Sequence, residues 1–261
     1  MFDFLKKINK KGKVIFLHMP KAGGTTLRQL FYDQYNHLKP GQVYTINRTK
    51  ETYKFINLSE REKKKIEILI GHMPFGLHEE LSSGFKYVTF LRNPLERVLS
   101  AYSYNREKHY SDVYDLINDE KLSLKSYLDK NIEPWLNNAM TKHLYGCTQE
   151  EFMQECTEEM FQKAIENLNE HFSFVGITEM FDESLVLLKD ILAWDTPRYE
   201  KLNQTGKKTC LSDLSEETIN RINELNKYDI RLYQIALKQF KELWESYDKD
   251  SKQLELTRIR E

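Results

Sequence analysis

Cysteine is scarce in this chain of 261 residues: three are present, Cys147, Cys156 and Cys210, and no two of them form a CxxC pair. An odd number without close pairs argues against a disulfide framework and against a zinc site, and it is typical of proteins in a reducing compartment. We therefore expect a cytoplasmic protein with no bound metal.

The sequence also lacks a long apolar run near its start. Residues 14–19 are too short for the apolar core of a signal peptide or for a membrane span, so neither is expected. Charge of one sign is not in excess, because 39 Lys and Arg residues against 40 Asp and Glu residues give a net charge of −1. This balance does not favour nucleic acid or an anionic membrane as a partner, so any anion site must be local.

Short apolar runs that end near glycine or proline are the clearest structural pattern. Residues 14–17, 67–70 and 87–91 are such runs, and a stretch that can form a helix follows each one. Residues 25–35, after the first run, carry apolar side chains at helical spacing. This order predicts an α/β fold with a P-loop-like central parallel sheet flanked by helices.

The second half of the chain has mainly helical periodicity. A late strand is predicted at residues 172–177, and a helix follows it over residues 182–193. Residues 215–247 are expected to pack back on the core. The polar residues 196–211 are the best candidate for a long functional loop.

The length and the hydrophobic content of 40% favour one domain that spans residues 1–261. Within it, residues 1–12 are interpreted as a solvated basic tail and residues 13–110 as the sheet-bearing core. Residues 111–261 form a helix-rich C-terminal half.

Glycines stand where the first strand turns into the first helix, in the stretch FLHMPKAGGTTL at residues 16–27. Main-chain N–H groups and a helix N-terminus converge there, an arrangement that binds phosphate. The lysine can reach over the anion, and two threonine hydroxyls add donors. The predicted anion contacts are Lys21, Ala22, Gly23, Gly24, Thr25, Thr26 and Leu27. A plain turn capped by threonine is the alternative interpretation.

The position of Lys21 separates this loop from a Walker A motif, in which the lysine lies between the last glycine and the Ser/Thr. Here the lysine precedes both glycines. In addition, no aspartate follows the strand ends at Leu17, Ile70 and Leu91. Both features weigh against a Mg²⁺-dependent P-loop kinase, which stays open as an alternative that predicts a preference for ATP.

A second polar pair lies on the next strand and helix. The strand delivers Arg92 at its carboxyl end, and Ser100 follows about two turns into the helix, so guanidinium and hydroxyl can meet on one phosphate. Arg97 is interpreted as structural, in an ion pair with Glu96 or Asp33, and a role in binding is its alternative.

One histidine stands at the end of a predicted strand, in the stretch IGHMPFGLH at residues 70–78. This places His72 at the carboxyl edge of the sheet, where α/β proteins bind ligands. We interpret five of the other histidines as ordinary core or surface residues, namely His18, His37, His109, His143 and His171.

Together these segments resemble the PAPS-dependent sulfotransferases, where PAPS is 3′-phosphoadenosine 5′-phosphosulfate. The lysine order is similar to their 5′-phosphosulfate loop, which needs no metal, and the Arg92 and Ser100 pair is similar to their grip on the 3′-phosphate. The Gly71-His72 element looks most like the uronyl and heparan sulfate 2-O-sulfotransferase branch, where the histidine is the general base. The resemblance covers roughly residues 13–245, and it implies that residues 13–110 form a donor-binding core.

Later segments extend this resemblance. Residues 174–179 resemble a family landmark that we interpret as mostly core. Residues 203–208 resemble the loop that closes over the 3′-phosphate, which implies donor contacts from Thr205, Lys207 and Lys208, with a solvated basic loop as the alternative. Cys147 and Cys156 lie near a cysteine pair of the 2-O branch, although free thiols are favoured.

The resemblance implies transfer of a sulfuryl group from PAPS to a hydroxyl, most simply on a carbohydrate, with adenosine 3′,5′-bisphosphate as the product. His72 would remove the hydroxyl proton, and Lys21 would stabilise the leaving oxygen. Candidate acceptor contacts are Arg48, Tyr102, Arg106 and Lys142, although ordinary surface positions are the alternative. Besides the kinase, a module that binds nucleotide or glycan without chemistry stays open. The sequence leaves the acceptor and the oligomeric state undetermined.

Overall fold

The structure is a computed structural model that describes residues 12–47, 49–107, 113–119, 122–199 and 210–260. Among these residues the strands are β1 Lys13–Leu17, β2 Val43–Ile46, β3 Ile68–Gly71, β4 Phe85–Leu91 and β5 Phe172–Ile177. The helices before β5 are α1 Gly24–Gln34, α2 Thr49–Ile56, α3 Glu60–Lys63, α4 Pro94–Glu107, α5 Tyr114–Asp119, α6 Leu124–Asp129, α7 Ala139–Tyr145, α8 Gln149–Met153 and α9 Glu158–His171. Those after it are α10 Phe181–Leu192, α11 Glu216–Leu225, α12 Lys227–Ser246 and α13 Lys249–Arg260.

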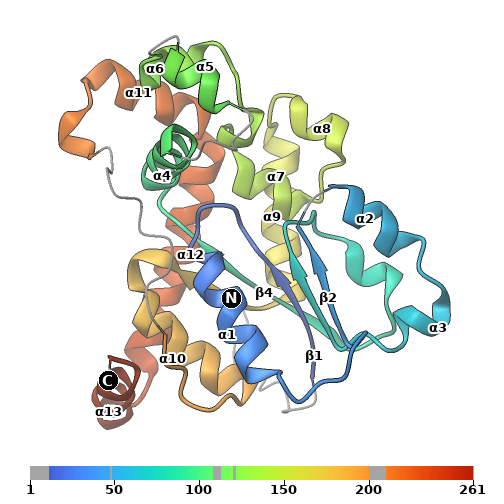
Figure 1. Cartoon of the computed structure of the whole chain (residues 1–261). Helices are drawn as coiled ribbons and strands as arrows, with labels where there is room; N and C mark the ends of the chain where they lie inside the picture. Colours follow the sequence, from blue (N-terminus) through green and yellow to red (C-terminus); the bar gives the residue numbers. More distant parts are fainter. Residues whose placement is uncertain (1–11, 48, 108–112, 120–121, 200–209, 261) are drawn as a thin grey trace.

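The strands form one parallel sheet in the order β2-β3-β1-β4-β5, and helices surround it (Figure 1). Leu17 at the end of β1 is in register with Gly71 of β3 and with Thr89 of β4, so the carboxyl ends of the three central strands lie together. The chain leaves β1 toward β2 on one side and later passes to β4 on the other. Such a divergence of connections is where α/β sheets bind ligands.

The α/β class and the four predicted strands are confirmed, but the sequence reasoning missed β2. This strand has four residues, lies at the edge of the sheet and is mostly half-buried. It therefore lacks the continuous apolar run by which buried parallel strands are recognised. The predicted helices over residues 25–35 and 182–193 correspond to α1 and α10.

The segment over residues 215–247 is divided into α11 and α12 at Asn226. The side chain of this buried residue donates from Nδ2 to the carbonyl of Ile222 at 3.0 Å. Its Oδ1 accepts hydrogen bonds from Arg97 Nη2 at 3.4 Å and from the Asn138 main chain at 3.3 Å. A buried polar network thus ends one helix and starts the next, while α12 packs on β5 as expected.

Two groups of buried apolar residues hold the fold together. The larger one surrounds the sheet, and the smaller one joins α4, α5, α6 and α11 through residues such as Val98, Ile117 and Ile222. Figure 1 shows these four helices beyond the end of the sheet toward which the loop after β1 projects. A helical layer therefore stands over the carboxyl edge of the strands.

Candidate functional site

The loop between β1 and α1 has the backbone of an anion site. Gly23 precedes the helix with φ of 77°, and Lys21 has φ of 65°, a left-handed conformation that a side-chain-bearing residue rarely adopts. A Cβ atom on Gly24 would lie 1.6 Å from His18 Nε2, so this position requires glycine. The first turn of α1 holds no acidic residue to neutralise the positive helix end.

The residues predicted to contact an anion in this loop differ in how exposed their side chains are. Ala22, Leu27 and Thr26 are buried, whereas Thr25 is half-buried. The main-chain N–H of Ala22 donates to the carbonyl of Met19 at 3.3 Å and is therefore engaged within the loop. The side chains best placed to meet an anion are those of Lys21 and Thr25.

The second predicted half of the site lies against the first. Arg92 follows β4, and its Nη1 donates to the main-chain carbonyl of Lys21 at 3.1 Å. Its Nη2 meets the carboxylate of Glu96 at 3.4 Å. From Glu96 the same face of α4 continues at intervals of four residues to Ser100 and Tyr104.

Lys21 also reaches this face of α4 through its side chain. Its ammonium lies 3.8 Å from the centre of the Tyr104 ring, a cation–π contact. The structure therefore brings Lys21, Arg92 and the face that carries Ser100 together, at the carboxyl ends of β1 and β4. Tyr104 is thus a further member of this site, and its spacing of four residues from Ser100 is the signal in the sequence that points to it.

Two further residues hold the end of β4 in place. Thr178 donates from its hydroxyl to the carbonyl of Leu91 at 3.0 Å, and Glu179 accepts from the main-chain N–H of Asn93 at 2.9 Å. The second carboxylate oxygen of Glu179 accepts from the hydroxyl of Tyr233 at 2.9 Å. The landmark at residues 174–179 is thus core along β5 and, at its end, a support for Arg92.

His72 directly follows β3 and is half-buried beside the same loop. Its Nδ1 lies 2.9 Å from the carbonyl oxygen of His18, and because a carbonyl only accepts, Nδ1 carries the hydrogen and the lone pair is on Nε2. Burial lowers the pKa of His72, and the positive charges of Arg28 and Lys21 lower it further, while the hydrogen bond to His18 opposes them. His72 is therefore neutral at pH 7.

Two of the residues predicted to contact the acceptor are buried and form hydrogen bonds within the protein. Tyr102 is buried and donates its hydroxyl to the carbonyl of Leu122 at 2.6 Å. Lys142 is only 1% exposed, and its ammonium donates to the carbonyls of Phe152 and Gln154 at 2.8 and 2.6 Å. These structural contacts do not fit a direct role in acceptor binding for either side chain.

Arg106 is exposed at the end of α4, with its guanidinium 5.5 Å from the Tyr102 ring centre. The other predicted contacts lie outside the described residues: Arg48, Thr205, Lys207 and Lys208.

Arg97 is structural, as expected, but its partners are different. It is fully buried, and its guanidinium meets Asp229 at 3.7 Å and the carbonyl of Trp135 at 3.1 Å. The predicted partners Glu96 and Asp33 are incorrect, because Glu96 faces Arg92 and Asp33 accepts from Gln29. Glu96 was predicted from its position next to Arg97 in the sequence, whereas the partner in the structure, Asp229, comes from α12.

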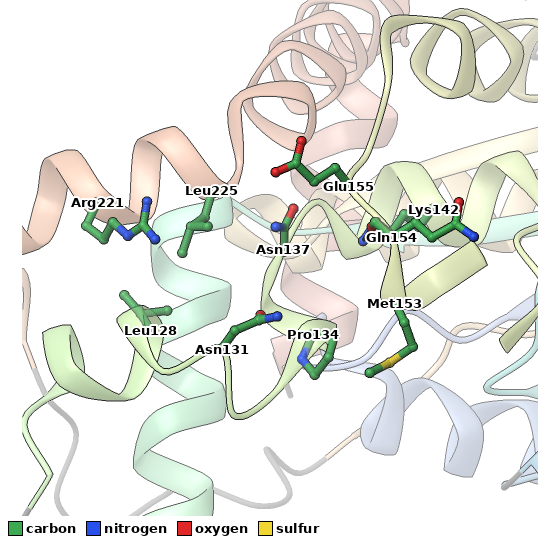
Figure 2. Close-up of a pocket in the computed structure, with 10 residues that line it drawn as sticks. All are labelled: Leu128, Asn131, Pro134, Asn137, Lys142, Met153, Gln154, Glu155, Arg221 and Leu225. Carbon is green, nitrogen blue, oxygen red and sulfur yellow. Dashed lines mark hydrogen bonds between the residues drawn. The ribbon is translucent and has the colours of Figure 1, made fainter. Parts of the chain in front are cut away.

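A cavity of about 210 Å³ lies in the helical layer (Figure 2). Arg221 and Leu225 of α11 and Leu128 of α6 line one end, and the residues at the end of α8 line the other. Met153, Gln154 and Lys142 belong to this second end, and Asn131, Pro134, Asn137 and Glu155 lie between the two ends.

Trp135 stands beside this cavity and is 40% exposed. Its ring packs on Phe152 at 4.1 Å between centres and on His143 at 6.1 Å, and His143 Nδ1 lies 3.3 Å from the carbonyl of Met73, the residue after His72. The exposed Trp135 ring is therefore connected to the segment after His72 through the buried rings of Phe152 and His143.

Within the part of the chain that the structure describes, no group of His, Cys, Asp and Glu residues is arranged to hold a metal ion. Across the same residues, no helix has the length and apolar character that crossing a membrane requires.

Relatives of known name match most of this chain. It is 25% identical to galactose-3-O-sulfotransferase 3 of Bos taurus over 84% of its length and 55% of the relative. It is 26% identical to heparan-sulfate 6-O-sulfotransferase 1-A of Danio rerio over 85% of its length and 63% of the relative. The chain thus spans little more than half the length of these relatives. A solved structure of retinol dehydratase with androsterone and the inactive cofactor PAP aligns with a TM-score of 0.29 at 14% identity, covering 87% of this chain and 84% of that one, which is too weak to bear on the fold.

The model of one protein family, described as galactose-3-O-sulfotransferase, matches residues 5–261. This match covers both the glycine loop and the face of α4 that meets it. The resemblance to carbohydrate sulfotransferases is therefore confirmed, although the 2-O branch suggested by the Gly71-His72 element is not. The chain belongs to the galactose-3-O-sulfotransferase family.

Proposed function

We propose that this chain transfers a sulfuryl group from PAPS to a hydroxyl of a saccharide. The observation that carries the proposal is the junction of Lys21 and Arg92, which joins a glycine-rich helix N-terminus to a second cationic group. The relatives named above are sulfotransferases of galactose and heparan sulfate, which supports both the reaction and the class of acceptor.

The residues of the site suit an anionic nucleotide with two separate phosphate groups. The first turn of α1, with Gly23, Gly24 and the Thr25 hydroxyl, would receive the 5′-phosphosulfate. Arg92 and Ser100 would bind the 3′-phosphate, because a guanidinium fork matches two phosphate oxygens. Lys207 and Lys208 remain predicted contacts outside the described residues.

In the proposed mechanism PAPS supplies the activated sulfuryl group, and the protein supplies the base and the charge. His72 Nε2 accepts the proton of the acceptor hydroxyl as its oxygen forms a bond to sulfur. Lys21 stabilises the electron pair that the breaking S–O bond leaves on the 5′-phosphate oxygen. No metal is required in this scheme, because Lys21, Arg92 and the helix N-terminus carry the compensating charge.

The exposed surface of Trp135 supports a saccharide as the acceptor. Aromatic rings with polar side chains around them are typical of pockets that bind and orient small polar ligands. Here the Trp135 ring packs on His143, whose Nδ1 lies beside the carbonyl of Met73, and the neighbouring cavity is lined by Asn131 and Asn137. Trp135→Ala is expected to raise the KM for the acceptor about tenfold with the KM for PAPS unchanged, and Trp135→Phe is expected to retain part of the effect.

We also propose that the chain works in the cytoplasm. The support is that Cys147 and Cys156 are buried free thiols, and that burial raises the pKa of each to about 12, which keeps them unreactive. Fractionation of the source cells with an antibody against the chain tests this directly. Recovery of the protein from a membrane-enclosed compartment would contradict it.

One assay separates the proposed function from its alternatives. The purified protein is incubated with ³⁵S-labelled PAPS and, in parallel, with γ-³²P-labelled ATP, each with methyl β-galactoside, lactose or heparan sulfate and with or without Mg²⁺. We expect transfer of ³⁵S to at least one acceptor, independent of Mg²⁺. Transfer of ³²P that depends on Mg²⁺ would favour the kinase, and binding of adenosine 3′,5′-bisphosphate without any transfer would favour the binding module.

A further inference from the structure

The ring of His18 lies between the glycine loop and His72. On one side its Nε2 faces Gly24 so closely that a Cβ atom there would lie 1.6 Å away. On the other side its centre is 4.1 Å from the centre of the His72 ring. Phe16 of β1 supports it from a third direction, nearly parallel at 5.6 Å. The ring is therefore fixed by β1, by the start of α1 and by the residue after β3.

His18 also touches His72 through its main chain. The carbonyl of His18 accepts the Nδ1 hydrogen of His72 at 2.9 Å. The ring nitrogen that remains without hydrogen, Nε2, is the one available to take a proton. His18 thus contacts His72 in two ways: its carbonyl bonds the Nδ1 hydrogen, and its ring packs against the His72 ring.

We propose that His18 is a positioning residue for sulfuryl transfer: its carbonyl selects the Nδ1–H tautomer of His72, and its ring holds the His72 ring in register with the glycine loop. The idea rests on the proposed function, because it assigns His72 as the base. It explains why glycine occupies position 24, since any side chain there would displace the His18 ring and with it His72.

The charges around the two histidines favour the neutral forms. Arg28 of α1 and Lys21 of the loop are positive and face both rings, and His143 of α7 is the third histidine of the group. Burial lowers the pKa of His143 to about 3 and holds the pKa of His18 well below its ordinary value. All three imidazoles are therefore neutral at pH 7, and His18 acts by shape and by its carbonyl, not as a second proton carrier.

A detail of His18 fits a role in packing. Its Nδ1 is buried and has no hydrogen-bond partner among the described residues. A buried nitrogen without a partner costs free energy, so this atom does not stabilise the fold. A phenylalanine at position 18 keeps the main-chain carbonyl and an aromatic ring beside His72 and has no buried nitrogen, so it is the conservative control.

The test compares His18→Ala, His18→Phe and the exposed His37→Ala in ¹⁵N-histidine NMR, in bisphosphate binding and in sulfuryl transfer across pH 5–9. The NMR spectra are recorded without a saccharide acceptor and report the tautomer of His72. The signals of His72 are identified as those that disappear in His72→Gln. His18→Ala keeps the carbonyl but loses the ring that holds His72 against it. We therefore expect a mixture of His72 tautomers, an acidic limb of the rate profile shifted to higher pH, and a kcat lower by about 10- to 100-fold. Bisphosphate affinity should stay within about twofold. His18→Phe and His37→Ala should behave like the wild-type protein.

Two outcomes would overturn the inference. One is a His18→Ala protein with the wild-type tautomer and the wild-type pH profile. The other is a His18→Phe protein that folds, binds the bisphosphate and yet loses the tautomer or the rate. The second test remains decisive if His18→Ala fails to fold. If the wild-type protein holds the Nδ1–H tautomer but transfers no sulfate to any acceptor, the proposed function fails while the structural role of His18 stands.

Discussion

Arg92 donates a hydrogen bond from its guanidinium to the main-chain carbonyl of Lys21, at 3.1 Å. The two residues are far apart in the sequence: Arg92 directly follows β4, and Lys21 lies in the loop after β1. Both strands are in the interior of the sheet. This hydrogen bond joins the loop after β1 to the end of β4 in one site. The Arg92 guanidinium lies between the Lys21 carbonyl and the carboxylate of Glu96.

Arg92 should therefore determine the preference for a nucleotide with a 3′-phosphate. In Arg92→Lys the charge remains but the planar fork is lost, so affinity for adenosine 3′,5′-bisphosphate should fall about 10- to 100-fold while affinity for 5′-AMP stays nearly unchanged. Calorimetric titration or thermal shift measures both. Arg106→Lys, on the exposed end of the same helix, is the matched control.

An equal loss of affinity for the two nucleotides in Arg92→Lys would contradict this role. So would a wild-type protein that binds 5′-AMP as tightly as the bisphosphate.

The parts of this site that depend on local pattern could be predicted from the sequence. Gly23-Gly24 and His72 are examples, because a tight turn favours glycine and a buried strand has a recognisable apolar run that His72 follows. The partners of Arg97 were not readable, because Asp229 is brought to it only by the packing of α12 on the core. His18 was interpreted as an ordinary residue, since nothing in the sequence shows that the ring of His72, the residue after β3, packs against it.

Lys142 illustrates the opposite error. A lysine in a helical region reads as surface, but here its stem is buried and two carbonyls at the end of α8 receive its ammonium. A buried lysine of this kind can be predicted only when the element that packs on it is known. Here that element is α8, which is too short to be recognised from the periodicity of the sequence.

Gly24 and His18 should be coupled. Gly24→Ala places a methyl group against the imidazole, and overpacking of this kind costs about 1–3 kcal/mol of the free energy of unfolding. Combining it with His18→Ala removes the obstacle, so the double variant should be less destabilised than the sum of the single ones. Urea denaturation of the four proteins measures the coupling, and strict additivity would show that the two residues do not interact.

Asp229 should be among the most sensitive positions for stability. It is fully buried and accepts hydrogen bonds from the main chain of Met140 and Thr141 and from the Thr141 hydroxyl, besides meeting Arg97. Asp229→Asn leaves the buried guanidinium without its counter-charge, so we expect a loss of about 3–5 kcal/mol in urea denaturation.

The exposed Asp33→Asn serves as the control for Asp229 and should change stability by less than about 0.5 kcal/mol. If Asp229→Asn also changed the free energy of unfolding by less than about 0.5 kcal/mol, the ion pair between Arg97 and Asp229 would contribute little to stability.

Acid should weaken the fold through its buried histidines. The pKa of His143 is about 3 in the folded chain and near 6.5 when unfolded, so between these values the unfolded chain binds more protons. The free energy of unfolding should therefore be highest above pH 6.5 and fall as the pH drops through this window, in the direction that His18 and His72 also favour.

His143→Gln removes one titrating group, so the fall in stability should become shallower by about 1.4 kcal/mol per pH unit. Chemical denaturation between pH 7 and pH 4 measures the slopes, with the exposed His37→Gln as the control. An unchanged slope in His143→Gln would place the acid sensitivity elsewhere in the molecule.

Sulfuryl transfer with His72 as the base is tested by measuring the transfer of ³⁵S from PAPS to a saccharide by the wild-type protein and by His72→Asn. Both proteins are first checked for equal affinity for the bisphosphate. We expect transfer by the wild-type protein and a rate lower by about 100-fold or more in His72→Asn. Equal transfer rates in the two proteins would contradict the account.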